Sequence, residues 1–192
     1  MTNKGYIKMS LLSALEILEL VEQGVIENVR EGAINYRADI NATSIDLYLG
    51  RDFLLEEIVD PENNIVNLAN RERPKMFEVK DTVILKPNQF CLGTTVERFH
   101  LPDNISAQYM LKSSHARAGL EHSLAGWCDA SWHNSTLTLE LKNNLEHHKL
   151  QLTAGMPIGQ MIFFRHKIVP KEFLYRNKGR YNNDETVKQL KD

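Results

Sequence analysis

Residues 112–120, Lys-Ser-Ser-His-Ala-Arg-Ala-Gly-Leu, combine hydroxyls and cations in a pattern that suits an anionic ligand. Ser113 and Ser114 are placed to start a short helical turn, because serine hydroxyls cap free N–H groups at a helix start. Those N–H groups also form a ready anion site. Lys112 precedes the serines, and Arg117 offers a planar fork that fits a carboxylate or phosphate. The segment predicts an anion site; the alternative is an ordinary helix start with a solvated arginine.

A carboxylate in the middle of a predicted strand is the second chemical candidate. Residues 136–141, Thr-Leu-Thr-Leu-Glu-Leu, alternate strictly, so the threonines and Glu140 share one face of the strand. Glu140 therefore points either to water or into a site. Residues 125–129, Ala-Gly-Trp-Cys-Asp, and Trp132 precede this strand in a turn-rich segment, where Asp129 can also serve local turn geometry.

The elements that must position these residues are mostly short strands. Ser13 and Glu16 form a capping box for one N-terminal helix, which Gly24 ends. Strands are predicted at 44–50, 82–85, 90–96, 136–141 and 159–164, whereas 60–75 is typical of an exposed loop or a long hairpin connection. Short strands separated by Pro, Gly and Asn indicate a sandwich or barrel.

The C-terminal segment changes in character. Residues 175–184 are polar, basic and aromatic, which fits either a disordered tail or a mobile lid that carries cations and rings to a phosphate site. A second helical stretch is predicted around 185–190.

Composition excludes several classes of protein. A chain of 192 residues that is 42% hydrophobic and 25% charged suits one domain with a single core. A net charge of -2 and a pI near 6.4 argue against nucleic-acid binding driven by bulk positive charge. Two cysteines form no disulfide framework, and no apolar run approaches the ~20 residues of a membrane span or resembles a signal core. We therefore expect a cytoplasmic protein with no membrane partner.

Several of these motifs, in this order, resemble the core of the dCTP deaminase family within the dUTPase superfamily. They are Lys-Ser-Ser-x-Ala-Arg-x-Gly-Leu, Ala-Gly-Trp-Cys-Asp and Leu-Glu-Leu. Residues 41–50 resemble the family's "SIDLRLG" strand, 86–90 its "HPGEF" turn, 155–160 its "PGMxIGQ" turn and 179–181 its "GKY" lid motif. The resemblance runs from about residue 10 to residue 184.

The resemblance implies a mainly β fold: a distorted, dUTPase-like β-barrel of jelly-roll type with a short N-terminal helix and a flexible C-terminal lid. We expect one domain over residues 1–192, with the barrel at about 10–170 and the lid at about 171–192. Members of the family assemble as homotrimers with sites at subunit interfaces, so the resemblance implies the same assembly here.

The resemblance also assigns site residues. Glu140 matches the catalytic glutamate, and Ser113 and Arg117 match residues that organise the catalytic end of the site. The substrate-binding residues that it implies are Lys112, Ser114 and Gln160 towards the phosphates, Ala125 at the base and water, Asp129 and Trp132 at the deoxyribose, and Gly126, Trp127, Tyr175 and Arg180.

The residue types suit a hydrolytic deamination. Cytosine deamination needs a water delivered to C4 and a proton delivered to the leaving amine. One glutamate can take a proton from the water and return it to the amine, and such general acid–base catalysis raises the rate roughly 10²–10⁴-fold. The H-x-E…P-C-x-x-C signature of zinc deaminases is absent, so we expect no zinc and no protein metal site. Mg²⁺ is expected to accompany the substrate triphosphate without activating the attacking water.

Departures from the family pattern concern the phosphate end. Lys112 replaces an arginine, which keeps the charge but loses the fork. Residues 130–134 lack the family's glycines, although Asn134 can adopt a left-handed turn. Asp184 stands where a glutamine is common and places a negative charge near the phosphates. We therefore expect dUTP and ammonia as the main products.

Three other functions stay open. A bifunctional enzyme that gives dUMP and pyrophosphate is favoured by residues 125–127, which resemble the "TAGF/TAGW" of bifunctional members, and by Gln160. A plain dUTPase is disfavoured by Glu140. A non-catalytic trimer that senses nucleotides on the same fold is the alternative from a different class.

Overall fold

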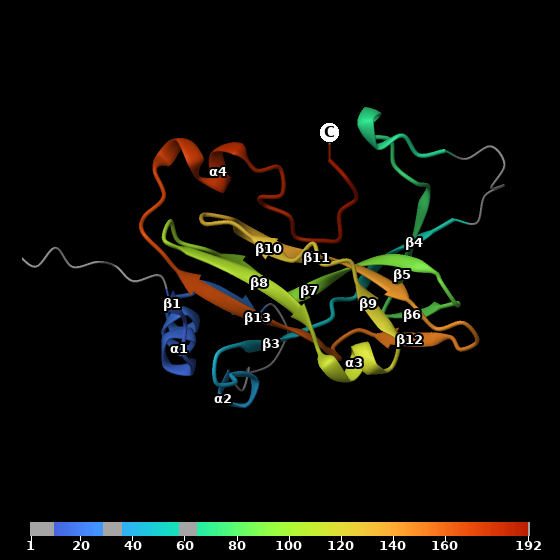
Figure 1. Cartoon of the computed structure of the whole chain (residues 1–192), viewed down its shortest axis with the longest axis horizontal. Helices are drawn as coiled ribbons and strands as arrows, with labels where there is room; N and C mark the ends of the chain where they lie inside the picture. Colours follow the sequence, from blue (N-terminus) through green and yellow to red (C-terminus); the bar gives the residue numbers. More distant parts are fainter. Residues whose placement is uncertain (1–9, 29–35, 58–64, 192) are drawn as a thin grey trace, which may run out of the picture.

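The computed structural model describes residues 10–28, 36–57 and 65–191, and its strands form two large antiparallel sheets and one small one (Figure 1). The first sheet has the order β1 (Ser10–Leu11), β13 (Pro157–Arg165), β8 (Ile105–Leu111) and β10 (Trp127–Cys128), and β3 (Ile45–Tyr48) also pairs with β13. The second has the order β5 (Met76–Lys80), β4 (Asp52–Glu56), β7 (Phe90–His100), β11 (His133–Asn143) and β9 (Leu120–His122), and β2 (Ile26–Asn28) pairs with β7. The small sheet joins β6 (Thr82–Leu85) to β12 (Leu150–Thr153).

The N-terminal helix α1 (Ala14–Glu22) begins where the capping box predicted it. The Glu16 carboxylate accepts hydrogen bonds from the Ser13 backbone N–H at 3.0 Å and the Ser13 hydroxyl at 2.9 Å. Gly24 has a φ of 72°, the left-handed conformation that a glycine adopts without a steric penalty. The remaining helices are single turns: α2 (Tyr36–Asp39), α3 (Ser113–Arg117), α4 (Tyr175–Lys178), and the 3-10 turns Leu68–Asn70 and Lys171–Phe173.

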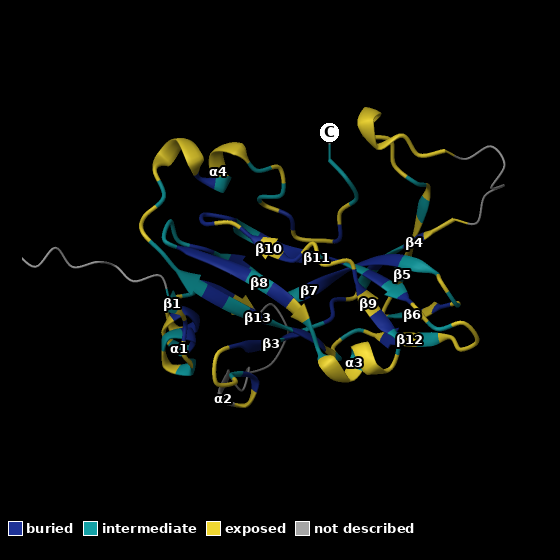
Figure 2. Cartoon of the chain, in the orientation of Figure 1, coloured by how far each residue is buried: buried dark blue, intermediate teal, exposed yellow. Residues whose placement is uncertain are grey.

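The hydrophobic core lies between the inner faces of the strands (Figure 2). Among its fully buried side chains are Phe53 of β4, Phe99 of β7, Leu139 of β11 and Phe163 of β13. Alternate residues of each strand supply these side chains, as the period of two in a β-strand requires. The mainly β fold with a short N-terminal helix that the sequence predicts is confirmed.

The five predicted strands all exist, within β3, β6, β7, β11 and β13. Of the loop or hairpin connection predicted at 60–75, residues 65–75 lie between the paired strands β4 and β5, and residues 60–64 lie outside the described residues. The predicted start of a helical turn at Ser113 is also confirmed. No helix in the described part of the chain is long and apolar enough to span a membrane.

The helix predicted around 185–190 is wrong, because this segment is irregular and lies along β11. Its backbone groups bond to the sheet instead of to each other: Thr136 N–H donates to the Asp184 carbonyl at 2.8 Å. The Lys188 N–H likewise donates to the Thr138 hydroxyl at 3.4 Å. Contacts with a neighbouring strand have thus overridden a weak local helical preference.

Candidate active site

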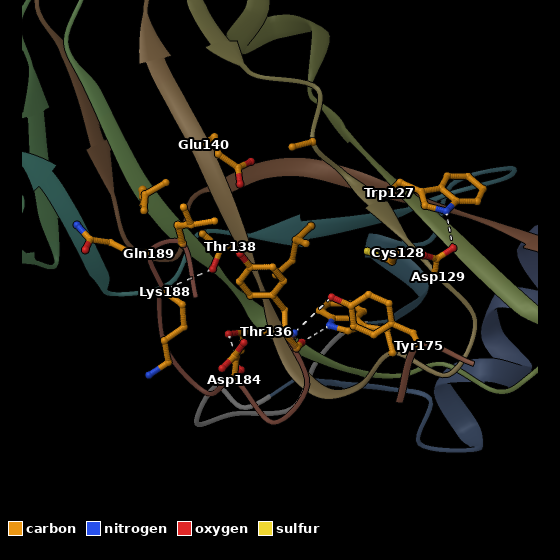
Figure 3. Close-up of a pocket in the computed structure, with 16 residues that line it drawn as sticks. Trp127, Cys128, Asp129, Thr136, Thr138, Glu140, Tyr175, Asp184, Lys188 and Gln189 are labelled. Carbon is orange, nitrogen blue, oxygen red and sulfur yellow. Dashed lines mark hydrogen bonds between the residues drawn. The ribbon is translucent and has the colours of Figure 1, made fainter. Parts of the chain in front are cut away.

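A cavity of about 490 Å³ lies between β11 and the C-terminal segment (Figure 3). Most of its residues come from β10, β11, the loop between them, and the chain from Tyr175 to Leu190, and Leu92 of β7 and Ala125 complete the lining. A volume of this size falls in the ~300–1,000 Å³ range of small-molecule sites. The cavity therefore has room for a ligand the size of a nucleoside.

The polar face of β11 forms one wall of this cavity. Thr136, Thr138 and Glu140 all line it, whereas Leu139 and Leu141 on the other face are completely buried. The alternation in the sequence predicted this division of the strand. Of the two orientations left open for Glu140, the structure shows the one that faces this cavity.

The Glu140 carboxylate is largely removed from water. Its side chain is 27% exposed, and its Oε2 lies 3.4 Å from Nε2 of His122, a residue that is 3% exposed. The Tyr109 ring meets the His122 ring edge-on at 4.7 Å between centroids. Burial, and then the charge of Glu140, raise the pKa of the Tyr109 hydroxyl, so this group stays neutral.

Sequence reasoning missed His122 and Tyr109. One signal for His122 was present, because Leu120 and His122 stand two residues apart and therefore share the inward face of β9. No comparable signal marked Tyr109. It approaches Glu140 only because β8 and β9 lie next to each other in space.

Trp127 and Asp129 form a pair on the opposite wall of the cavity. The indole Nε1–H of Trp127 donates to Oδ1 of Asp129 at 2.9 Å, and the ring is 55% exposed. Gly126 does not line the cavity; a Cβ there would lie 2.9 Å from Cβ of Tyr109, so a side chain is excluded. Ala125 does line the cavity, next to this pair in the chain.

Cys128 also lines the cavity but has no nucleophilic role. Its thiol is buried, and burial raises its pKa far above the usual value. The thiol therefore stays protonated and unreactive near neutral pH.

The C-terminal segment is attached to the barrel by hydrogen bonds from Trp132 and Ser135. The Trp132 Nε1–H donates to the Tyr181 carbonyl at 2.6 Å, and the Ser135 hydroxyl donates to the same oxygen at 3.1 Å. The Trp132 ring stacks on Phe99 at 5.5 Å and is 5% exposed. Trp132 lines the cavity, and its indole N–H holds the C-terminal segment.

Tyr175 reaches the cavity from the start of α4. Its hydroxyl accepts from the Tyr181 N–H at 3.3 Å, and a Cβ at Gly179 would lie 2.1 Å from its ring. Burial raises the pKa of this hydroxyl. Arg180 is exposed and does not line the cavity, whereas Lys188 and Gln189, which were not predicted, do.

The predicted anion-binding residues lie elsewhere in the chain. Ser113, Ser114 and Arg117 are exposed on α3, at the opposite edge of the molecule from the C-terminal segment (Figure 1). Lys112 pairs with Oδ2 of Asp46 at 2.5 Å, and the other predicted phosphate-side residue, Gln160, accepts from the Ser44 hydroxyl at 3.0 Å. These five residues do not line the Glu140 cavity of the same chain.

The loop at 130–134 keeps a turn geometry without glycine. Ser131 has a φ of 70° and Asn134 a φ of 50°, so two ordinary residues occupy left-handed conformations. The buried Ser131 hydroxyl accepts from the Arg176 N–H at 3.0 Å, which fixes the loop against α4. The loop therefore forms its turn although it lacks the glycines of the family pattern.

Comparison with known proteins identifies the class that this fold and site define. A family model described as dCTP deaminase-like matches residues 11–166, and the chain belongs to that family. It is similar to "dCTP deaminase, dUMP-forming" of Methanoculleus marisnigri, with 36% identity over 157 residues, 76% of this chain and 80% of the relative. The relative of the same name from Methanospirillum hungatei is 36% identical over 154 residues, with the same two shares.

Other relatives are consistent with this family. The "dCTP deaminase" of Haloarcula marismortui is 34% identical over 161 residues, 80% of this chain and 79% of the relative. A crystal structure of 2'-deoxycytidine 5'-triphosphate deaminase from Agrobacterium tumefaciens superposes with a TM-score of 0.63 at 18% identity. That match covers 82% of this chain and 48% of the other, so this chain spans about half its length. At this identity the likeness establishes the shared fold.

Proposed function

We propose that this protein is a hydrolase that deaminates dCTP. The observation that carries the proposal is Glu140, a half-buried carboxylate that faces a nucleoside-sized cavity from the polar side of β11. Membership of a family whose similar relatives are named dCTP deaminases supports the same activity.

In the proposed reaction Glu140 moves the protons. The carboxylate takes a proton from water as the water oxygen bonds to C4 of cytosine. It then gives this proton to the exocyclic nitrogen, the C4–N bond breaks, and ammonia leaves, while the proton left on the C4 hydroxyl ends on N3. One water is consumed, and the base becomes uracil. A positioned acid and base of this kind contribute roughly 10²–10⁴ in rate.

The cavity suggests how the nucleoside is oriented. We place the cytosine base near Glu140 and the deoxyribose towards Asp129. Trp127 donates to Oδ1 of Asp129, so we assign the sugar to Oδ2. The rings of Trp127 and Tyr175 border the cavity, and aromatic rings pack well against a sugar or base. Ala125 would contribute backbone groups, as its match to the family implies.

A second copy of the chain is proposed to complete the site. Ser113 and Arg117 are exposed on α3 and do not reach the Glu140 cavity of their own chain. In a closed homotrimer, α3 of one subunit can meet the cavity of the next, which gives equivalent sites by symmetry. Lys112, Ser114, Gln160 and Arg180 would then serve the phosphates.

Mg²⁺ is proposed to arrive with the triphosphate and to neutralise part of its charge. Among the described residues, no group of three or more His, Cys, Asp or Glu side chains could hold a metal ion. We place the protein in the cytoplasm, where its substrate would be found.

A second candidate is the continuation of the reaction to dUMP and pyrophosphate. Two features of the sequence argued for dUTP as the final product: the missing glycines at 130–134 and the charge of Asp184. The structure forms the turn through Ser131 and Asn134, and Lys191 neutralises Asp184 at 2.6 Å. The dUMP-forming names of the Methanoculleus and Methanospirillum relatives favour the two-step reaction, which we therefore propose.

One assay tests these proposals together. The full chain is incubated with Mg²⁺ and either dCTP or dUTP, ammonia and pyrophosphate are measured, and nucleotide binding is measured by calorimetry. Ammonia supports the deaminase, and both products support the two-step enzyme. Pyrophosphate from dUTP without any ammonia from dCTP would show a plain dUTPase. Binding without turnover would show a nucleotide sensor.

A further inference from the structure

Three buried polar atoms without a hydrogen-bond partner cluster at Glu140, the proposed general base. They are Oε2 of Glu140, Nε2 of His122 and the Tyr109 hydroxyl, out of five such side-chain atoms in the described part of the chain. Buried polar groups are nearly always paired, and each exception calls for a reason. Three of the five belong to Glu140, to His122, which lies 3.4 Å from it, and to Tyr109, whose ring packs against His122, and this clustering points to a functional reason.

The surroundings hold the His122 ring against Glu140. His122 is opposite Leu141 in the β9–β11 ladder, one residue from Glu140. The Tyr109 ring packs edge-on against the imidazole, with 61° between the ring planes. A Cβ at Gly159 would lie 2.4 Å from the Tyr109 hydroxyl, so the backbone of β13 in turn fixes Tyr109. The imidazole therefore has little freedom to turn away from the carboxylate.

We infer that His122 is a positioning residue for Glu140, donating from Nε2–H to Oε2 and so holding the carboxylate towards the cavity. This inference rests on the proposed deaminase function. The two atoms are 3.4 Å apart, and a small rotation of either side chain brings them to hydrogen-bond distance. A donor to a carboxylate also favours its ionised form, which is the form that a general base needs.

A purely structural histidine is the alternative, and the kinetic constants of two variants separate it from a positioning residue. If His122 positions Glu140, its removal lowers kcat while KM changes little, and a substitute that restores an N–H near the position of Nε2 restores kcat. A structural defect would lower kcat in both variants, whether or not the N–H is restored.

The experiment compares His122→Phe with His122→Gln in the full chain. Phenylalanine fills the buried space without a donor, whereas the glutamine amide can place an N–H near the position of Nε2. We expect His122→Phe to lower kcat for dCTP by about 10- to 100-fold with little change in KM, because misplacing a reacting group has effects of this size. His122→Gln should recover most of the lost kcat.

His100→Phe is the matched control. His100 faces a carboxylate in a similar way, with Nε2 3.2 Å from Oε2 of Glu27, but it does not line the cavity. This control should leave kcat and KM unchanged. Equal losses of kcat in the Phe and Gln variants, or a loss that appears in KM instead of kcat, would overturn the inference. If wild-type protein releases no ammonia from dCTP, it is the proposed function that has failed, and this is seen before any variant is made.

Discussion

The Lys191 ammonium donates to both carboxylate oxygens of Asp184, at 2.6 Å and 2.7 Å, and so closes the C-terminal segment onto itself. The Asp184 side chain is 8% exposed, and its backbone carbonyl accepts from Thr136 N–H on β11. The pair thus neutralises a buried charge next to the cavity and helps to keep the segment in place along β11.

Lys191→Met should release this segment. Removing one partner of a buried pair leaves an uncompensated charge, at a cost of up to about 3–5 kcal/mol, although a terminal segment can lower that cost by detaching. We expect amide exchange at 182–190 to speed up by more than about tenfold, because the opening is local and the core stays folded. The KM for dCTP should rise. Unchanged exchange in this segment would show that the pair does not hold it.

Lys149→Met is the control for this experiment. Lys149 is an exposed lysine between β11 and β12, so its replacement changes the net charge equally. It should alter neither the exchange at 182–190 nor the KM.

Glu140→Gln should abolish ammonia release while nucleotide binding persists. The amide keeps the shape of the side chain but cannot accept the proton of the attacking water, so kcat should fall by about 10²–10⁴. Ammonia assays and dCTP titrations by calorimetry measure the two effects. Glu121→Gln is the control, because Glu121 is exposed on the neighbouring strand β9. Near-normal turnover by Glu140→Gln would remove this residue from the mechanism.

Local patterns predicted most of the fold and one wall of the site. The capping box at Ser13 and the alternation along β11 depend on residues a few positions apart, and both were confirmed. The orientation of Glu140 followed from the same alternation. Such signals can be read from the sequence because they are set by backbone geometry alone.

Long-range contacts account for what the sequence did not predict. His122 and Tyr109 meet Glu140 only because β8, β9 and β11 pack together. The irregular path of 185–190 depends on the hydrogen bonds offered by Thr136 and Thr138, which lie about 50 residues earlier. The sequence also did not predict that Lys191 neutralises the charge of Asp184, since this contact depends on how the C-terminal segment folds back.

Zinc chelation should leave deamination intact. In the proposed mechanism the water is activated by Glu140, and Mg²⁺ serves only the phosphates. Deamination activity should survive a chelator that removes even trace amounts of zinc, provided that Mg²⁺ is kept in excess. Stoichiometric zinc in the purified protein, together with loss of activity when it is removed and recovery when it is restored, would contradict this mechanism.

Mixing two inactive variants should restore activity if the site lies between subunits. Arg117→Ala subunits keep Glu140, and Glu140→Gln subunits keep Arg117. In trimers co-assembled from equal amounts, about a quarter of the sites would combine the two intact halves, so roughly a quarter of wild-type activity is expected. Sedimentation of the mixture should show trimers. No recovery in confirmed mixed trimers would place both residues in one subunit's site, and a monomer that turns over dCTP would exclude the assembly altogether.

The order in which products appear should separate the one-step from the two-step enzyme. Hydrolysis of the phosphoanhydride depends on positioning and on charge neutralisation, and the structure has a formed loop at Ser131 and an Asp184 carboxylate neutralised by Lys191. We therefore expect dUMP and pyrophosphate to appear together with ammonia, without accumulation of free dUTP. A rapid-quench time course with labelled dCTP measures all the species. Accumulation of dUTP at the same rate as ammonia, with dUMP forming later or not at all, would show that the reaction ends at deamination, as the sequence alone led us to expect.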